Sequence, residues 1–255
     1  MRRTTAIAAM AAVVALGAAA CSSSSSGGGS SSSPASSGGT VDIYSSLPLQ
    51  GASSAQTGPL VNGIKLALSQ AGNKAGQWTV NYQSLDDSTA AAGAWDPGQT
   101  AANARKVASD PKAVYYIGEF NSGASEVSIP ILNQAGIPQV SPANTYVGLT
   151  TAVPGVSAPG EPQKYYPTGI RTYARVVPSD AVEARAQVRL QQASGCNKTF
   201  ILDDGEFDGD DAEASFQVAA RGAHLKLAGV QTFDPRVKDY RRLQRQSPRP
   251  GPIAC

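Results

Sequence analysis

The stretch that decides the fold is AVYYIGEFNSGASEVSIPILNQAGIPQVSP, residues 113–142. Its opening run, AVYYIG, is apolar and ends at a glycine, which is typical of a buried strand. A helical pattern follows from Ser122 to Gly136, and the apolar run IPQVSP comes directly after it. Pro130 is expected to bend this helix or to move its start. A strand, a helix and a second strand in this order predict a parallel sheet with helices packed on it.

The same alternation continues on both sides of this stretch. It is interrupted by a Pro- and Gly-rich segment, residues 150–169, which we expect to be a long loop. The fold class is therefore α/β, with a first lobe over 41–170 and a partial second lobe over 171–240. We expect strands at 40–47, 78–87, 113–118, 137–142, 171–177, 198–204 and 226–234, and helices at 58–72, 96–111, 122–136, 179–195 and 209–223.

The last segment, residues 241–255, differs from the rest of the chain. It is rich in Arg and Pro and has no apolar period. One interpretation is a disordered tail. The other is that the chain stops partway through its second lobe.

The start of the chain predicts export. Residues 1–20 combine Arg2 and Arg3 with an uncharged apolar stretch that is too short for a stable membrane span, as in a secretory signal peptide. Small residues precede Cys21, so the segment resembles a bacterial lipoprotein signal with Ala18 where leucine is usual. We expect Cys21 to carry lipid and residues 21–40, rich in Ser and Gly, to be a flexible tether. The alternative is an ordinary secretory signal that leaves Cys21 a free thiol.

Composition excludes several classes of protein. The chain has 21 Lys and Arg against 19 Asp and Glu, and removing Arg2 and Arg3 leaves 19 against 19. A nearly neutral chain does not favour nucleic acid as a partner. Cys196 and Cys255 could pair in an oxidising space, but they do not make a disulfide scaffold. Past the signal there is no membrane-span candidate, so we expect the lipid alone to attach the protein to a membrane.

Enzyme and cofactor motifs are not found. The one histidine, His224, is expected at the surface, and the chain has no G-x-S-x-G elbow, no G-x-G-x-x-G after the first strand and no phosphate loop. Within the acidic segment DDGEFDGDD, Asp204, Glu206, Asp208 and Gly209 mimic the start of a calcium-binding loop. Counted from Asp204, the twelfth position is Ser215, where a glutamate is needed. We therefore expect a protein that is not an enzyme and uses no cofactor or metal.

Four segments carry a family resemblance: GASSAQTGPLVNGIKLAL at 51–68, YYIGEFNSGASEVSIPILNQAGIPQVSPANT at 115–145, TYARVVPSD at 172–180 and FILDDGEFDGDDAEASF at 200–216. Over residues 41–240 the chain resembles the extracytoplasmic solute-binding proteins of branched-chain amino acid ABC transporters. These leucine-binding-protein-like chains have the two-lobed type I periplasmic binding protein fold, with parallel sheets flanked by helices. Family members continue well beyond this length, so the resemblance implies that the second lobe is incomplete, through truncation or a frame shift.

The resemblance implies a ligand site between the lobes, at the carboxyl ends of the strands. Backbone N–H groups at the helix start, 121–124, suit a carboxylate, and Ser122 adds a hydroxyl. In the next turn, the Ala143 carbonyl and the Thr145 hydroxyl would take an ammonium. The alternative is that Ser122 only caps its helix and that Ser141 and Pro142 only form a turn. The expected ligand-binding residues of this lobe are Asn121, Ser122, Gly123, Ala143, Asn144 and Thr145.

Three further positions complete the expected site. Gln56 stands where relatives often carry an aromatic cover. Asp208 and Gly209 follow a strand of the second half, where relatives carry a tyrosine and a glycine, and Asp208 would pair with a cationic group of the ligand.

The resemblance implies an amino acid or related small polar solute, taken up through an ABC permease by a protein anchored to the outer face of the cell membrane. Alternatives are a ligand-sensing receptor module of the same fold and a non-functional truncated fragment.

Overall fold

The computed structural model describes residues 38–205, 207–234, 237 and 239–246, without the side chains of residues 207–210 and 246. The expected signal peptide, Cys21 and most of the expected tether lie outside these residues. Within the described residues, no helix is both long enough and apolar enough to cross a membrane.

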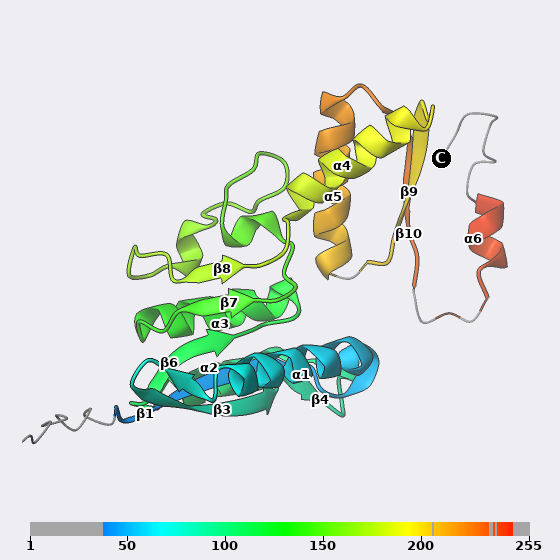
Figure 1. The fold of residues 1–255 in the computed structure, drawn as a ribbon. Helices are drawn as coiled ribbons and strands as arrows, with labels where there is room; N and C mark the ends of the chain where they lie inside the picture. Colours follow the sequence, from blue (N-terminus) through cyan, green and yellow to red (C-terminus); the bar gives the residue numbers. More distant parts are fainter. Residues whose placement is uncertain (1–37, 206, 235–236, 238, 247–255) are drawn as a thin grey trace, which may run out of the picture. The chain divides into compact units, whose positions relative to one another are not determined.

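The first part of the chain forms a six-stranded sheet in the order β2-β3-β1-β6-β7-β8 (Figure 1). Every neighbouring pair is parallel except β2 with β3. Because the other five strands run in one direction, their carboxyl ends meet at one edge of the sheet. The strands are β1 (Thr40–Leu47), β2 (Lys74–Ala75), β3 (Trp78–Asp86), β6 (Ala113–Ile117), β7 (Gln139–Ser141) and β8 (Tyr173–Arg175), and a small antiparallel pair consists of β4 (Ser88–Thr89) and β5 (Ala94–Trp95).

Three helices connect these strands: α1 (Ser54–Gln70), α2 (Pro97–Ala108) and α3 (Ser122–Gln134). The connection through α1 runs toward one edge of the sheet, and the connections through α2 and α3 run toward the other. Right-handed crossovers therefore place α1 on one face and both α2 and α3 on the opposite face. The core under α2 and α3 consists of Tyr44, Ala104, Val107, Tyr116, Leu132 and Ile137.

Helix starts follow local chemistry. The Asp-Pro pair is confirmed as the start of α2, where the Asp96 carboxylate accepts the Gln99 N–H at 2.8 Å. Helix α1 begins four residues earlier than its apolar spacing predicts, because its first turn is fixed by a polar contact, Thr57 Oγ1 to the Pro48 carbonyl at 2.6 Å. Helix α3 begins at Ser122 and continues through Pro130, so this proline does not move the start.

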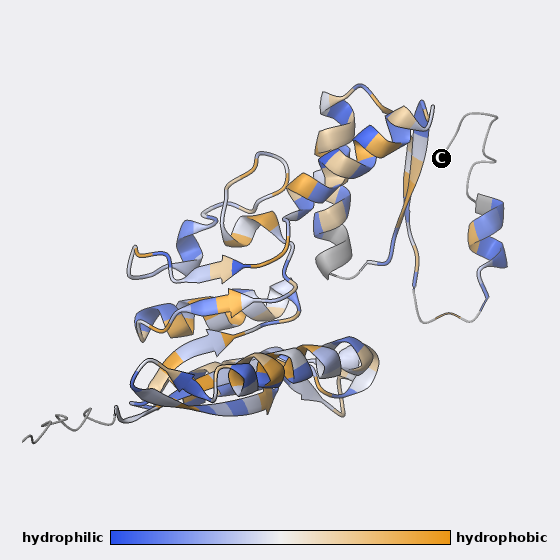
Figure 2. Cartoon of the chain, viewed as in Figure 1, coloured by the Kyte–Doolittle hydropathy of each residue, from blue (hydrophilic) through white to orange (hydrophobic). Residues whose placement is uncertain are grey.

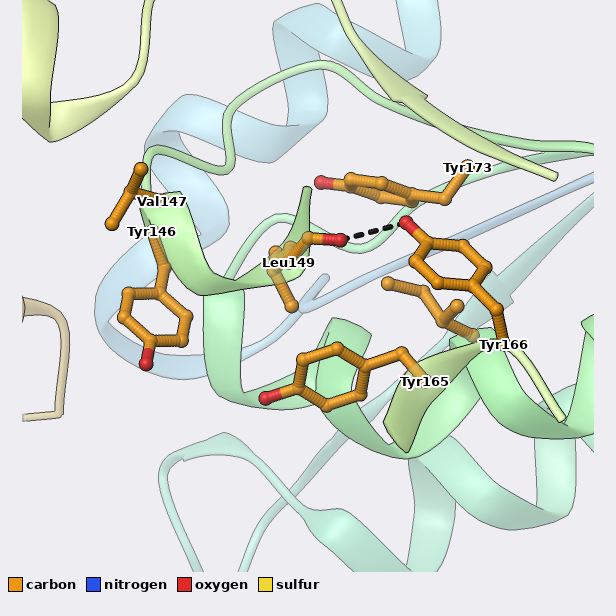
Figure 3. Close-up of a cluster of buried hydrophobic side chains, with 7 residues drawn as sticks. Tyr146, Val147, Leu149, Tyr165, Tyr166 and Tyr173 are labelled. Carbon is orange, nitrogen blue, oxygen red and sulfur yellow. Dashed lines mark hydrogen bonds between the residues drawn. The ribbon is translucent and has the colours of Figure 1, made fainter. Parts of the chain in front are cut away.

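The segment expected as a long loop, 150–169, follows the 3-10 turn η2 (Val147–Leu149) and contains the 3-10 turn η3 (Gln163–Tyr165). It packs in a core that also includes residues of α3 and β8 (Figure 3). The Tyr166 hydroxyl donates to the Leu149 carbonyl at 2.6 Å. Glu161 is 4% exposed and accepts hydrogen bonds from Tyr146, Tyr165 and the Ala158 N–H, while Lys164 lies 2.8 Å from it. These contacts hold the loop in one conformation. The core residues are Ile129, Tyr146, Val147, Leu149, Tyr165, Tyr166 and Tyr173.

Strand β8 belongs to the first sheet. It pairs with β7 through Gln139 with Tyr173 and Ser141 with Arg175. The expected boundary at residue 171 assigned this strand to the second lobe, whereas its hydrogen bonds join it to the first sheet. A strand this short has no sequence signal for its partner, because pairing is decided by long-range contacts.

The following residues form α4 (Asp180–Ala193), β9 (Lys198–Asp203), α5 (Phe207–Gly222), β10 (Lys226–Thr232) and α6 (Arg241–Gln246). Strands β9 and β10 are parallel and paired. Helices α4 and α5 pack together in a core of Ala184, Val188, Phe216 and Ala220, which Leu225, just before β10, completes. Residues 241–246, in which the sequence has no apolar period, form the mostly hydrophilic helix α6 (Figure 2). Cys196 is buried and disulfide-bonded. Since Cys255 lies outside the described residues, its pairing with Cys196 stays a prediction.

Candidate ligand-binding site

The loops that follow β6 and β7 lie side by side at the carboxyl edge of the first sheet. The Asn144 amide donates to the Phe120 carbonyl at 2.8 Å, and the Tyr146 N–H donates to Ser122 Oγ at 3.3 Å. These two bonds join the loop after β7 to the loop that leads into α3. The structure therefore brings together the two turns that the sequence singled out, 121–124 and 143–145.

The N-terminus of α3 lies at this edge. Its N-cap, Asn121, makes no side-chain cap hydrogen bond, and Ser122 is 2% exposed. The first N–H groups of a helix have no acceptor within the helix and carry a partial positive charge. Such a helix start can bind a carboxylate through main-chain donors. Ser122 also fixes the neighbouring loop, because its hydroxyl accepts from Tyr146.

Asn144 is a structural residue of the loop. It is 1% exposed, and its side-chain oxygen accepts from Ser125 at 2.5 Å and from Tyr173 at 2.8 Å. Its carbonyl accepts from Arg175 at 3.2 Å. With its amide bound to Phe120, Asn144 joins α3, β8 and both loops, and its polar atoms are directed into the protein.

Its neighbours in the sequence are more accessible. Ala143 and Thr145 are half-buried, and the Thr145 carbonyl accepts the Asp180 N–H at 2.9 Å. Between the two loops, Ser141 Oγ donates to the Glu119 carbonyl at 2.7 Å and accepts from the Ala143 N–H at 3.1 Å. Ser141 therefore ties the two loops together as well as forming a turn.

The remaining expected residues lie on other elements. Gln56 is exposed in the first turn of α1, which follows β1 at the same edge of the sheet. Asp208 and Gly209 are in the first turn of α5, after β9, and their side chains are not described. His224 is exposed in the turn between α5 and β10 and has a positive φ of 56°. Its place in this turn agrees with the expected surface histidine.

Three carboxyl groups, none of them predicted from the sequence, lie around this edge. Burial opposes ionisation of Asp86, but hydrogen bonds from Ser88, Gln50 and the Leu49 N–H hold its pKa below the usual value. Asp87 and Glu119 are both 0% exposed. Burial raises the pKa of Asp87 to about 6, and burial together with the charge of Asp87 raises that of Glu119 well above its usual value.

Sequence reasoning treated Glu119 only as part of a turn, and it missed Ser125, Tyr173 and Arg175. The available signal for Ser125 was a polar residue on a helix whose other positions follow an apolar pattern. The described residues contain no group of three His, Cys, Asp or Glu side chains that could hold a metal ion. A cavity of about 360 Å³ lies between α4, α5 and β9, and no described residue of the expected site lines it.

The parallel sheet, its flanking helices and the turns at its carboxyl edge make up the type I periplasmic binding protein fold. The family model described as periplasmic binding protein matches residues 40–248. The chain therefore belongs to the periplasmic binding protein family. No curated protein sequence was found to match it.

Solved structures with this fold include an ABC transporter substrate-binding protein from Desulfitobacterium hafniense in complex with Leu, at 20% identity and a TM-score of 0.60, covering 81% of this chain and 54% of that one. A leucine-binding protein from Thermotoga maritima has 20% identity and a TM-score of 0.63, and the match covers 80% of this chain and 51% of that one. A solute-binding protein from R. palustris in complex with 4-hydroxybenzoate has 17% identity and a TM-score of 0.64, with coverages of 81% and 50%. The present chain thus spans about half the length of these proteins.

Proposed function

We propose that this protein captures a small solute with a carboxylate, an amino acid or a related acid, for uptake through an ABC permease. The observation that carries the proposal is the N-terminus of α3, which lies at the carboxyl edge of the sheet and is joined to the 143–145 turn. Open parallel sheets bind their ligands at this edge. The role is binding, and no bond of the solute is made or broken.

Each group in the two turns has a proposed role. The N–H groups of Ser122 and Gly123 bind the solute carboxylate, to which the helix start offers main-chain donors. The Ala143 carbonyl and the Thr145 hydroxyl accept from an ammonium when the solute has one. The Leu and 4-hydroxybenzoate in the related structures share a carboxylate, and only Leu has an ammonium. A site with both kinds of group agrees with either class of solute.

Uptake requires more than this one lobe. We propose that Asp208 and Gly209 contribute from the second lobe, and that the solute shifts an equilibrium between open and closed forms toward the closed one that the permease recognises. Lipid on Cys21 holds the protein at the outer face of the membrane, on the 21–40 tether. Stable attachment needs more than one acyl chain.

The test is calorimetric titration of the 255-residue chain with leucine, benzoate and leucinamide, which has no carboxylate. We expect binding of at least one acid and none of leucinamide. Thr145→Val removes the hydroxyl at nearly constant volume, so leucine affinity should fall about 10-fold or more while benzoate affinity stays the same. The matched control is Thr151→Val at an exposed threonine. Equal binding of leucine and leucinamide would contradict carboxylate recognition at α3.

A further inference from the structure

Asp87 and Glu119 are two buried carboxyl groups at the carboxyl edge of the sheet, and Glu119 belongs to the loop that leads into α3. Asp87 directly follows β3, Glu119 lies two residues after β6, and β1 runs between these two strands. Both residues are 0% exposed, and they lie close enough for the charge of Asp87 to raise the pKa of Glu119. They lie at the same edge of the sheet as the ligand-binding turns.

The pair has few other partners. The Tyr116 hydroxyl donates to Glu119 Oε1 at 2.6 Å. Glu119 Oε2 and both carboxyl oxygens of Asp87 are buried and have no hydrogen-bond partner among the described residues. No described lysine, arginine or histidine forms an ion pair with either residue. A buried carboxylate with no cation beside it is costly to ionise.

The groups around the pair do not supply a positive charge. The titratable neighbours are Asp86 from β3 and Tyr116 from β6. Ser46 from β1 and Asn103 from α2 are neutral, and Asn103 Nδ2 donates to Ser46 Oγ at 3.1 Å. Since carboxylates only accept hydrogen bonds, two of them can bond to each other only when one carries a proton.

The pair is also connected to the ligand-binding turns through the main chain. The Glu119 N–H donates to Ser125 Oγ at 3.1 Å, and its carbonyl accepts from Ser141 Oγ at 2.7 Å. Ser125 donates to Asn144, and Ser141 accepts from the Ala143 N–H. A movement of Glu119 is therefore transmitted directly to both turns.

We propose that Asp87 and Glu119 share one proton in the folded protein, and that losing this proton weakens both the fold and solute binding at α3. The effect on solute binding rests on the proposed function, whereas the effect on the fold does not. A buried pair of like charges would push its members apart, and the displaced Glu119 would disturb the 121–124 and 143–145 turns.

The direction of the pH dependence follows from the same geometry. The usual pKa values are 3.8 for Asp87 and 4.5 for Glu119, and burial raises both in the folded protein. The folded state thus keeps protons to a higher pH than the unfolded chain. The pair's stabilising effect is fully present below the unfolded values and is lost as pH rises through the folded values.

The experiment measures the Tm of the 255-residue chain from about pH 5 to about pH 9. We expect the Tm of the wild type to fall by about 5 °C or more over this range. Glu119→Gln replaces the protonated carboxyl with an amide that donates to Asp87 without titrating, so its Tm should fall less. Glu183→Gln, at an exposed carboxylate of α4, is the matched control and should follow the wild type.

A Glu119→Gln profile parallel to that of the wild type would overturn the shared proton. Asp87→Asn tests the same bond from its other side, and it too should have a flattened profile, which keeps the proposal falsifiable where one variant fails to fold. Leucine and benzoate titrations at about pH 6 and about pH 8 should show weaker binding at the higher pH in the wild type only. A pH-dependent Tm without binding of either acid would contradict the proposed function and leave the shared proton intact.

Discussion

Asn144→Ala is the substitution that tests most directly how the candidate site is held together. Its side chain bonds to the Phe120 carbonyl, the Ser125 hydroxyl and the Tyr173 hydroxyl, and it is 1% exposed. A buried polar group left without its partner costs about 1–3 kcal/mol. The Phe120 carbonyl and the Ser125 and Tyr173 hydroxyls each lose a partner, and small shifts of these groups recover part of the cost. We therefore expect the free energy of unfolding to fall by about 3–5 kcal/mol, which lowers the Tm by about 8–15 °C.

Urea denaturation followed by fluorescence gives the free energy, and a thermal melt gives the Tm. Asn197→Ala is the control, because Asn197 is exposed and the same truncation there should change stability by no more than about 0.5 kcal/mol. A loss below about 1 kcal/mol for Asn144→Ala would refute the argument. It would mean that Asn144 does not hold the two loops together and is free to contact a solute.

Other substitutions test separate parts of the fold. A Cβ on Gly118 would lie 2.7 Å from the Ser46 carbonyl oxygen, so Gly118→Ala should lower the free energy of unfolding by about 1–3 kcal/mol. Gly63 lies on α1 with open space around it, so Gly63→Ala should raise the free energy of unfolding by about 0.5–1 kcal/mol. Urea denaturation measures both changes. Asp96→Ala removes the cap of α2 and should cost about 1 kcal/mol, with loss of helical circular dichroism on heating. Burial opposes ionisation of Glu161, but Lys164 and three hydrogen-bond donors lower its pKa in the folded protein. The stability that ionised Glu161 contributes is therefore lost as pH falls through the folded pKa. Glu161→Gln should flatten the acid side of a pH–Tm curve, and an unchanged acid side would contradict this role of Glu161.

Local patterns were sufficient to predict most of the elements. The apolar run of β6 and the helical spacing of α3 are local patterns in the sequence. The bounds predicted from each pattern agree with the observed bounds to within about two residues. The carboxyl edge could also be predicted, since parallel strands bring the turns after β6 and β7 together.

What the sequence could not predict depends on contacts between distant segments. The pairing of β8 with β7 is decided by tertiary packing, and so is the core of the tyrosine-rich loop around Glu161. The role of Asn144 was missed for another reason. A polar residue in a turn looks the same in sequence whether it faces a solute or the protein interior, and only its burial distinguishes the two.

The donors at the start of α3 belong to the main chain, and main-chain atoms remain when a side chain is replaced. Only a proline can remove such an N–H group. Exposed Gln56 and half-buried Thr145, by contrast, can be exchanged without disturbing the polar layer under the loops. Under the proposed function, single substitutions at these two positions would therefore change the preference among acids, while carboxylate binding itself would be kept by the main chain of α3.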